Sequence, residues 1–99
     1  MHNIRYRDYE EKVNRKKVEK ELNKIVAWES RYEGGGGLLT PVRWLDWEPI
    51  CETDSDALEL IRKRDMGWYD ALAVRYYVPL EKGQRKRRVR WLVKFEYHT

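Results

Sequence analysis

The last part of the chain contains the pattern that most restricts the fold. A strand is predicted from Arg87 to Tyr97, and from Arg88 onward its residues alternate in character, with one of the two sets entirely apolar: Val89, Trp91, Val93, Phe95 and Tyr97. Successive side chains of a strand point to opposite faces, so a period of two predicts a strand with one buried face. The other set is mostly charged, and we expect it to face water.

Length and composition fit one small domain. The chain has 99 residues, 41% of them apolar and 13% aromatic, which excludes collagen, low-complexity sequence and a disulfide scaffold and argues against intrinsic disorder. The only cysteine is Cys51, so an intramolecular disulfide and a Cys-x-x-Cys pair are both excluded. Because no apolar run is long enough for a membrane helix and the N-terminus is charged, we expect a cytoplasmic protein with no membrane partner.

Residues 1–33 are predicted to form an N-terminal helical segment. From Ile4 to Glu33 there is no Gly or Pro, and good helix formers are abundant, which predicts one long helix or two helical pieces. On a helical wheel one apolar face holds Val18, Leu22, Ile25, Val26, Trp28 and Tyr32, and the nearly opposite face holds Tyr6, Tyr9 and Val13. The faces change at Asn14. Either the segment bends there and folds back, or its first part contacts a partner or a second copy.

Gly34–Gly37 is predicted to be a linker between this segment and a core at residues 38–99. A phosphate-binding loop is disfavoured, since no strand precedes the glycines and no Lys-Ser/Thr follows them. Residues 38–47 are predicted to form a strand that either lies at a sheet edge or starts at Pro41, because proline cannot donate a ladder hydrogen bond.

A helix is predicted to start at residues 53–56, where Thr53 has the capping-box spacing with Asp56, although Asp54 or Ser55 could cap the helix instead. Gly67 is its predicted C′ residue. The helix is expected to bury Ala57, Leu58, Leu60 and Ile61. Ala71–Val78 is predicted to be a second strand, and the alternating segment is the third.

The predicted fold is therefore α+β, with two layers and the order α-β-α-β-β. The two strands that flank the helix should be parallel, and the last two should form an antiparallel hairpin. We expect a three-stranded mixed sheet with both helices on one face, and we place the last strand between the other two. The open edges of such a small sheet make a homodimer credible.

The sequence contains no assembled catalytic, cofactor or metal motif. Cys51 and His98 could form a nucleophilic couple only if the fold brought them together, and no His and Cys have zinc-ligand spacing. Asp46 and Glu48 lie two residues apart, a spacing that fits an acid/base pair and equally a solvated strand edge. We predict no catalytic residue, no metal and no cofactor.

Aromatic clusters are expected mainly to fill the core, because large rings bury the most surface in a small domain. Trp47 and Trp68 are the expected exceptions, since one lies at a strand end and the other beyond a helix end. Together with Tyr6, Tyr9 and Val13 they are the predicted partner-interface residues.

The clearest charge signal lies in the C-terminal hairpin. The net charge of +4 divides into +2 for residues 1–33, −3 for residues 34–78 and +5 for residues 79–99. The predicted anion- or nucleic-acid-binding residues are Arg85, Lys86, Arg87, Arg88, Arg90 and Lys94. Arginine forks suit phosphate, but a basic hairpin is also a common way to keep a sheet edge from aggregating.

Two segments resemble parts of small uncharacterised proteins encoded on bacterial mobile elements. They are Lys63-Arg-Asp-Met-Gly-Trp-Tyr-Asp-Ala-Leu-Ala-Val-Arg-Tyr76 and Pro41-Val-Arg-Trp-Leu-Asp46. The resemblance implies a bacterial, cytosolic accessory protein and assigns no site residue.

Three hypotheses follow for the function. The first is a non-enzymatic interaction protein that associates with itself or with another protein. The second is a nucleic-acid-binding accessory protein that uses the basic hairpin. The third is a small enzyme whose site the sequence does not assign.

Overall fold

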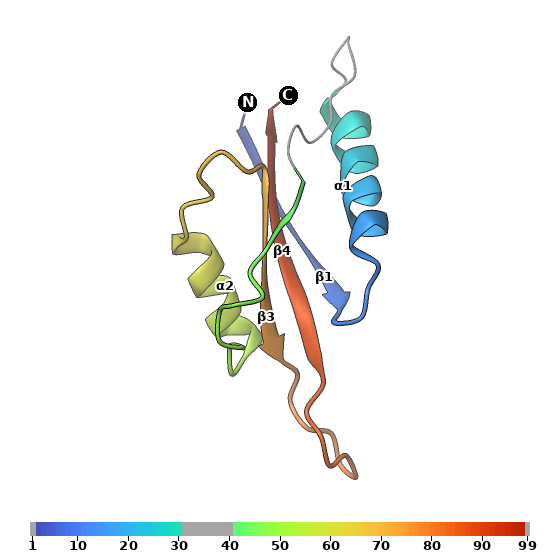
Figure 1. Ribbon diagram of the computed structural model, residues 1–99, viewed down its shortest axis with the longest axis vertical. Coiled ribbons are helices and arrows are strands. Elements are labelled where there is room, and N and C mark those ends of the chain that lie inside the picture. The colour runs from blue at the N-terminus through green and yellow to red at the C-terminus, as the bar shows by residue number, and fades with distance from the viewer. Residues whose placement is uncertain (1, 31–40, 99) are drawn as a thin grey trace.

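The computed structural model describes residues 2–30 and 41–98 (Figure 1). Its elements follow in the order β1 (His2–Glu10), α1 (Arg15–Ser30), β2 (Arg43–Trp44), α2 (Asp54–Lys63), β3 (Ala71–Tyr77) and β4 (Val89–His98). The class is α+β, as predicted, and the four strands form one mixed sheet with the order β1-β4-β3-β2. The prediction of three strands is wrong, because β1, His2–Glu10, forms where a helix was expected.

β1 shows a distant pairing overriding a local preference. It pairs antiparallel with β4, Val89–His98, from His2 opposite His98 to Glu10 opposite Arg90. Its Arg and Glu residues favour helix in isolation. A complete row of backbone hydrogen bonds to β4, supported by Ile and Tyr at strand positions, outweighs that preference.

The change of apolar face at Asn14 marks the true start of the helix. The Asn14 side-chain oxygen accepts hydrogen bonds from the N–H groups of Lys16 at 3.0 Å and Lys17 at 3.2 Å, which is N-cap geometry. α1, Arg15–Ser30, begins directly afterwards. The second apolar set therefore precedes the helix and lies on β1 and the loop that follows it.

β4 lies inside the sheet, but not between the strands that we predicted. It pairs antiparallel with β3, Ala71–Tyr77, and β3 pairs in parallel with β2, Arg43–Trp44. Both predicted pairing directions are confirmed. The predicted insertion of β4 between the other two strands is wrong, because β1 supplies its second neighbour.

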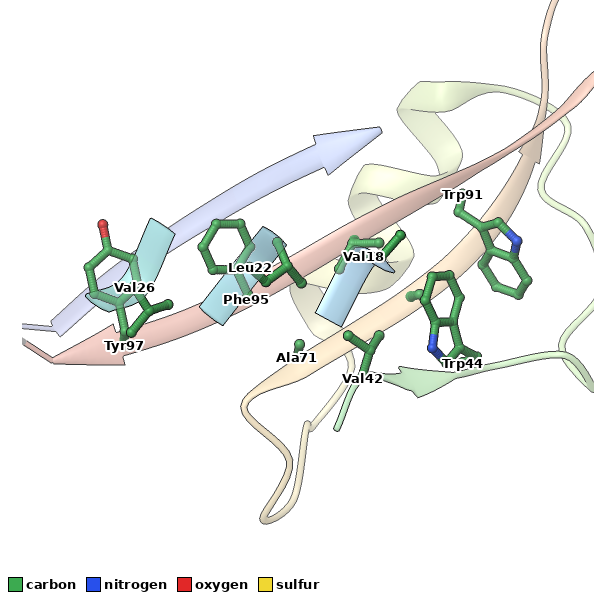
Figure 2. Close-up of a cluster of buried hydrophobic side chains, with 11 residues drawn as sticks. Val18, Leu22, Val26, Val42, Trp44, Ala71, Trp91, Phe95 and Tyr97 are labelled. Atoms are coloured by element: carbon green, nitrogen blue, oxygen red, sulfur yellow. The ribbon is translucent and has the colours of Figure 1, made fainter. Parts of the chain in front are cut away.

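The α1-side core is built around the apolar row of β4 (Figure 2). Its buried members are Val18, Leu22, Val26, Val42, Trp44, Ala71, Ala73, Trp91, Val93, Phe95 and Tyr97. Trp44 and Trp91 meet edge to face, with ring centroids 4.9 Å apart. The burial predicted from the alternating pattern is confirmed for Trp91, Val93, Phe95 and Tyr97, whereas Val89 is only half-buried.

The two helices cover opposite faces of the sheet, which corrects the predicted two-layer arrangement (Figure 1). α2, Asp54–Lys63, packs against Leu72 and Val74 of β3 and against Leu92 of β4. The face of β4 that was expected to be wet is therefore covered in part, and both Leu92 and Lys94 are buried. The domain has a helix–sheet–helix order of layers.

α2 begins where the sequence predicted and ends earlier. The Thr53 hydroxyl accepts a hydrogen bond from the N–H of Asp56 at 3.1 Å, so the predicted cap is present. Arg64 is the C-cap, and Gly67 lies three residues beyond it with a φ of +64°. The prediction of Gly67 as the C′ residue is wrong, although its positive φ does favour glycine.

The β2 edge is interrupted by a turn. The N–H of Leu45 donates to the carbonyl of Ala73 at 3.0 Å, and the chain returns to β3 at Cys51, which bridges to Tyr76. The intervening turn contains Trp47. Residues 31–40, and with them the predicted linker Gly34–Gly37 and the first residues of the predicted strand 38–47, lie outside the described residues.

Candidate functional site

Most cations of the basic hairpin are held by carboxylates of the same chain. Arg88 and Arg90 both donate to the same Glu10 oxygen, at 2.5 and 2.6 Å. Arg87 donates to Glu52 at 2.5 Å and lies 3.8 Å from the centre of the Tyr77 ring. These interactions neutralise positive charges that the sequence alone had made candidates for binding phosphate.

Lys94 is the predicted anion-binding residue that the fold removes from the surface. Its residue surface is 7% exposed, and its ammonium group lies 3.5 Å from a Glu96 carboxylate oxygen. Four of the six predicted basic residues are thus engaged within the chain. Arg85 and Lys86 stay exposed, and in the described residues neither has a carboxylate partner.

A shallow groove of about 580 Å³ separates the hairpin from the end of β1. Its described lining consists of Glu10, Glu11, Lys12, Lys86, Arg87, Arg88 and Val89. Both positive and negative side chains line it, so the groove does not present a surface of one sign to a polyanion.

The predicted interface set Tyr6, Tyr9 and Val13 divides in the structure. Tyr9 and Val13 pack against the α1-side core, and burial beside the Glu21 carboxylate raises the pKa of Tyr9 to about 12. Tyr6 points to the other face of β1, where it is 38% exposed beside Ile4, which is 48% exposed. Sequence reasoning missed Ile4 because it treated this segment as helix, although Ile4, Tyr6 and Asp8 share a period of two.

The backbone of β1 bonds to β4 at alternate residues. In β4 the N–H of Glu96 donates a hydrogen bond to the carbonyl of Asp70 at 2.8 Å, and the carbonyl of Arg88 accepts one from the N–H of Val78 at 2.9 Å. The even-numbered residues of β4 therefore form their backbone hydrogen bonds towards β3. Its odd-numbered residues therefore bond to β1, where odd-numbered residues lie opposite them. The N–H and C=O groups of Ile4, Tyr6 and Asp8 consequently point away from the sheet.

The α2-side face of β1 is not covered by a helix. α2 contacts β3 and β4 but does not contact β1 within the part of the chain that is described. Ile4 and Tyr6 lie on this face, next to the free edge. An exposed apolar pair is thus adjacent to a row of backbone groups that has no partner strand in residues 2–30 and 41–98.

A second exposed surface joins the two predicted tryptophans. Trp47 is 65% exposed and Trp68 is 73% exposed. Trp68 stacks on Tyr69 with centroids 4.3 Å apart, and the Arg43 guanidinium lies 5.6 Å from the ring centres of both Tyr69 and Trp47. We call these four residues the aromatic–arginine row. Sequence reasoning found its two ends but missed Arg43 and Tyr69, which only the parallel β2–β3 pairing brings together.

The fold does not bring Cys51 and His98 together as a nucleophilic couple. Cys51 bridges to Tyr76, which lies opposite Arg90, whereas His98 lies eight residues further along β4, a span of about 27 Å. Burial, followed by the charge of Asp56, raises the pKa of the Cys51 thiol. Both effects disfavour the thiolate that a nucleophile needs.

Asp46 and Glu48 bind different arginines and do not act as a pair. Asp46 accepts two hydrogen bonds from Arg15, at 3.0 and 2.6 Å, and this arginine holds the pKa of the carboxyl below its usual range. Glu48 forms an ion pair with Arg64. Across residues 2–30 and 41–98, no three His, Cys, Asp or Glu side chains group closely enough to hold a metal ion.

Comparison with models of protein families, with curated proteins and with solved structures finds no match. The resemblance to proteins of bacterial mobile elements therefore stays a prediction. Neither helix in the described segments has the length and apolarity to cross a membrane.

Proposed function

We propose that the protein is a small non-enzymatic interaction protein that binds a second copy of itself through the free edge of β1. The observation that carries this proposal is the outward direction of the backbone groups of Ile4, Tyr6 and Asp8, beside two exposed apolar side chains. Unpaired N–H and C=O groups along a strand are a template for another strand. β1 has nine residues and β2 has two, so β1 offers the longer edge.

Antiparallel pairing of two β1 strands about a twofold axis suits these side chains. In one register Ile4 of each copy lies opposite Tyr6 of the other, and both have outward backbone groups. Cross-strand pairs of an aromatic and a β-branched residue stabilise a sheet. This register buries part of each exposed apolar pair and joins the two sheets into one.

Charge helps to select the register. If Tyr6 faced its own counterpart, Arg5 would lie opposite Arg7 twice, and like charges directly opposite each other are destabilising. With Ile4 opposite Tyr6, the like-charged contact is Arg5 with its own counterpart. Arg7 then lies opposite Asn3, and within its own chain it is already paired with Glu21 at 2.8 Å.

Self-association should depend on Ile4 and Tyr6 and not on exposed apolar side chains in general. We expect Ile4→Lys and Tyr6→Lys to shift the protein to monomer in sedimentation equilibrium over a wide concentration range. Trp28→Lys is the matched control, because Trp28 is 84% exposed on α1, which covers the opposite face of the sheet from Ile4 and Tyr6. The proposal is wrong if the wild type is monomeric throughout, or if the control dissociates the dimer equally.

Amide hydrogen exchange gives a readout for each residue of β1. The amides of Arg5 and Arg7 should be protected at every protein concentration, because they bond to β4. Those of Ile4, Tyr6 and Asp8 should become protected only as the concentration rises. Association that leaves these three amides unprotected would place the interface elsewhere.

A further inference from the structure

The aromatic–arginine row is a surface that self-association through β1 does not use. It lies where the turn after β2 meets the residues before β3, at the opposite edge of the sheet from β1. Its outer members, Trp47 and Trp68, are the largest side chains in this region and are mostly exposed. Trp, Tyr and Arg are the residue types that contribute most strongly to protein interfaces.

Arg43 is distinct from the other arginines of the described chain. Arg7, Arg15, Arg64, Arg87, Arg88 and Arg90 form ion pairs with carboxylates, and Arg75 donates to the Asp46 carbonyl. Arg43 instead contacts two aromatic rings, and none of its N–H groups has an acceptor in the described residues.

Position also distinguishes Arg43 from Arg62 and Arg85, for which no acceptor is found in the described part of the chain either. Those two side chains are exposed on α2 and on the hairpin, whereas Arg43 is half-buried on a strand. Contact with two rings restricts its guanidinium, so less side-chain entropy is lost when a ligand binds. A guanidinium held in this way presents a fork of donors that matches a carboxylate.

We infer that the aromatic–arginine row binds a carboxylate of a partner protein, from an Asp or Glu flanked by an apolar side chain. The carboxylate would accept two hydrogen bonds from Arg43, and the apolar neighbour would pack on Trp47 or Trp68. Arg43 is the single cation among the four residues of the row. One guanidinium suits one carboxylate, whereas a polyanionic strand such as nucleic acid is bound by several positive charges.

A random peptide library displayed on phage tests this inference with the full chain as the immobilised target. Enriched peptides should contain Asp or Glu next to a large apolar residue. Exchange of that acid for its amide should weaken binding at least tenfold, as measured by fluorescence anisotropy of the labelled peptide. Arg43→Gln and Trp68→Ala should weaken binding by a similar factor without changing the thermal unfolding midpoint.

Matched controls separate the row from general effects. Arg62→Gln removes another arginine without an acceptor, and Trp28→Ala removes another exposed tryptophan, so both should leave binding unchanged. Ile4→Lys should also leave it unchanged, which separates this site from the β1 edge. The inference is overturned if no acidic peptide is enriched, if Arg43→Gln binds as well as wild type, or if a single-stranded oligonucleotide binds in an Arg43-dependent way.

Discussion

At the scale of a single residue, the hydroxyl of Tyr76 links β3 to β1. It donates to Asp8 of β1 at 2.6 Å, across β4, which lies between β1 and β3. Burial and the Asp8 carboxylate raise the pKa of Tyr76 to about 12. Tyr9 has a pKa of about 12 as well, from burial and Glu21. Both phenols therefore hold their protons more tightly in the folded chain than in the unfolded chain.

This predicts a loss of stability at alkaline pH. The contribution of the two phenols is complete below pH 10.0, the ordinary tyrosine value, and is lost as the pH rises through about 12. Tyr76→Phe should lower the free energy of unfolding by about 1 kcal/mol at neutral pH and make the alkaline decline shallower. Urea unfolding at several pH values measures both effects. Tyr6→Phe is the control on β1, and equal alkaline slopes for Tyr76→Phe and wild type would contradict the prediction.

At the scale of elements, Arg15 attaches the start of α1 to the turn after β2. Besides its two hydrogen bonds to Asp46, its guanidinium lies 4.9 Å from the Trp44 ring centre and 5.3 Å from that of Trp91. The ion pair is about half exposed, so its charge contributes little on its own. Packing of the arginine on two rings contributes more.

The two parts of this contact can be separated by substitution. Asp46→Asn should cost under about 1 kcal/mol of unfolding free energy, and Arg15→Ala about 1–2 kcal/mol. Because Arg15 lowers the pKa of Asp46, the cost of Asp46→Asn should shrink as the pH falls below about 4. Chemical unfolding at several pH values measures this change in the cost of Asp46→Asn. Glu52→Gln, which loses a hairpin ion pair, is the control, and a pH-independent cost of Asp46→Asn would refute this account.

At the scale of the whole molecule, added salt should strengthen the proposed dimer, whereas it weakens binding to nucleic acid. Salt screens the Arg5 pair at the centre of the dimer, so we expect the dimer dissociation constant to fall as salt rises. Arg5→Gln should tighten the dimer at low salt and remove this dependence, as measured by sedimentation equilibrium. Lys24→Gln, on α1, is the control. A dimer that weakens steadily with salt would contradict the proposed register.

The parts of the fold that were predictable from sequence are those with local signals. The alternation in β4 and the Thr53 cap of α2 are set within a few residues, and both were found. β1 could not be found in this way, because its conformation depends on a partner almost the whole chain away. The two-sided covering was missed because Leu92 and Lys94 were read as members of a wet face.

The candidate sites follow the same rule. Exposure of Trp47 and Trp68 was predictable, since both lie outside the regular elements. The position of Arg43 between Trp47 and Tyr69 was not, because parallel pairing of β2 with β3 brings together residues that are far apart in sequence. The positive charge of the hairpin was predictable from the sequence, but its neutralisation by Glu10 and Glu52 is visible only in the structure.

The pairing of the first strand with the last has a consequence for the order of folding. β1 is synthesised before the other described elements, yet β4, the strand with which it pairs among the described residues, is synthesised after all of them. Until then its apolar residues have no sheet to join, and closing this chain-long loop should limit the folding rate. A circular permutant that joins the adjacent ends of β1 and β4 and opens the chain at the hairpin tip makes that contact local. It should therefore refold faster in stopped-flow experiments, while the layers of the native domain stay the same.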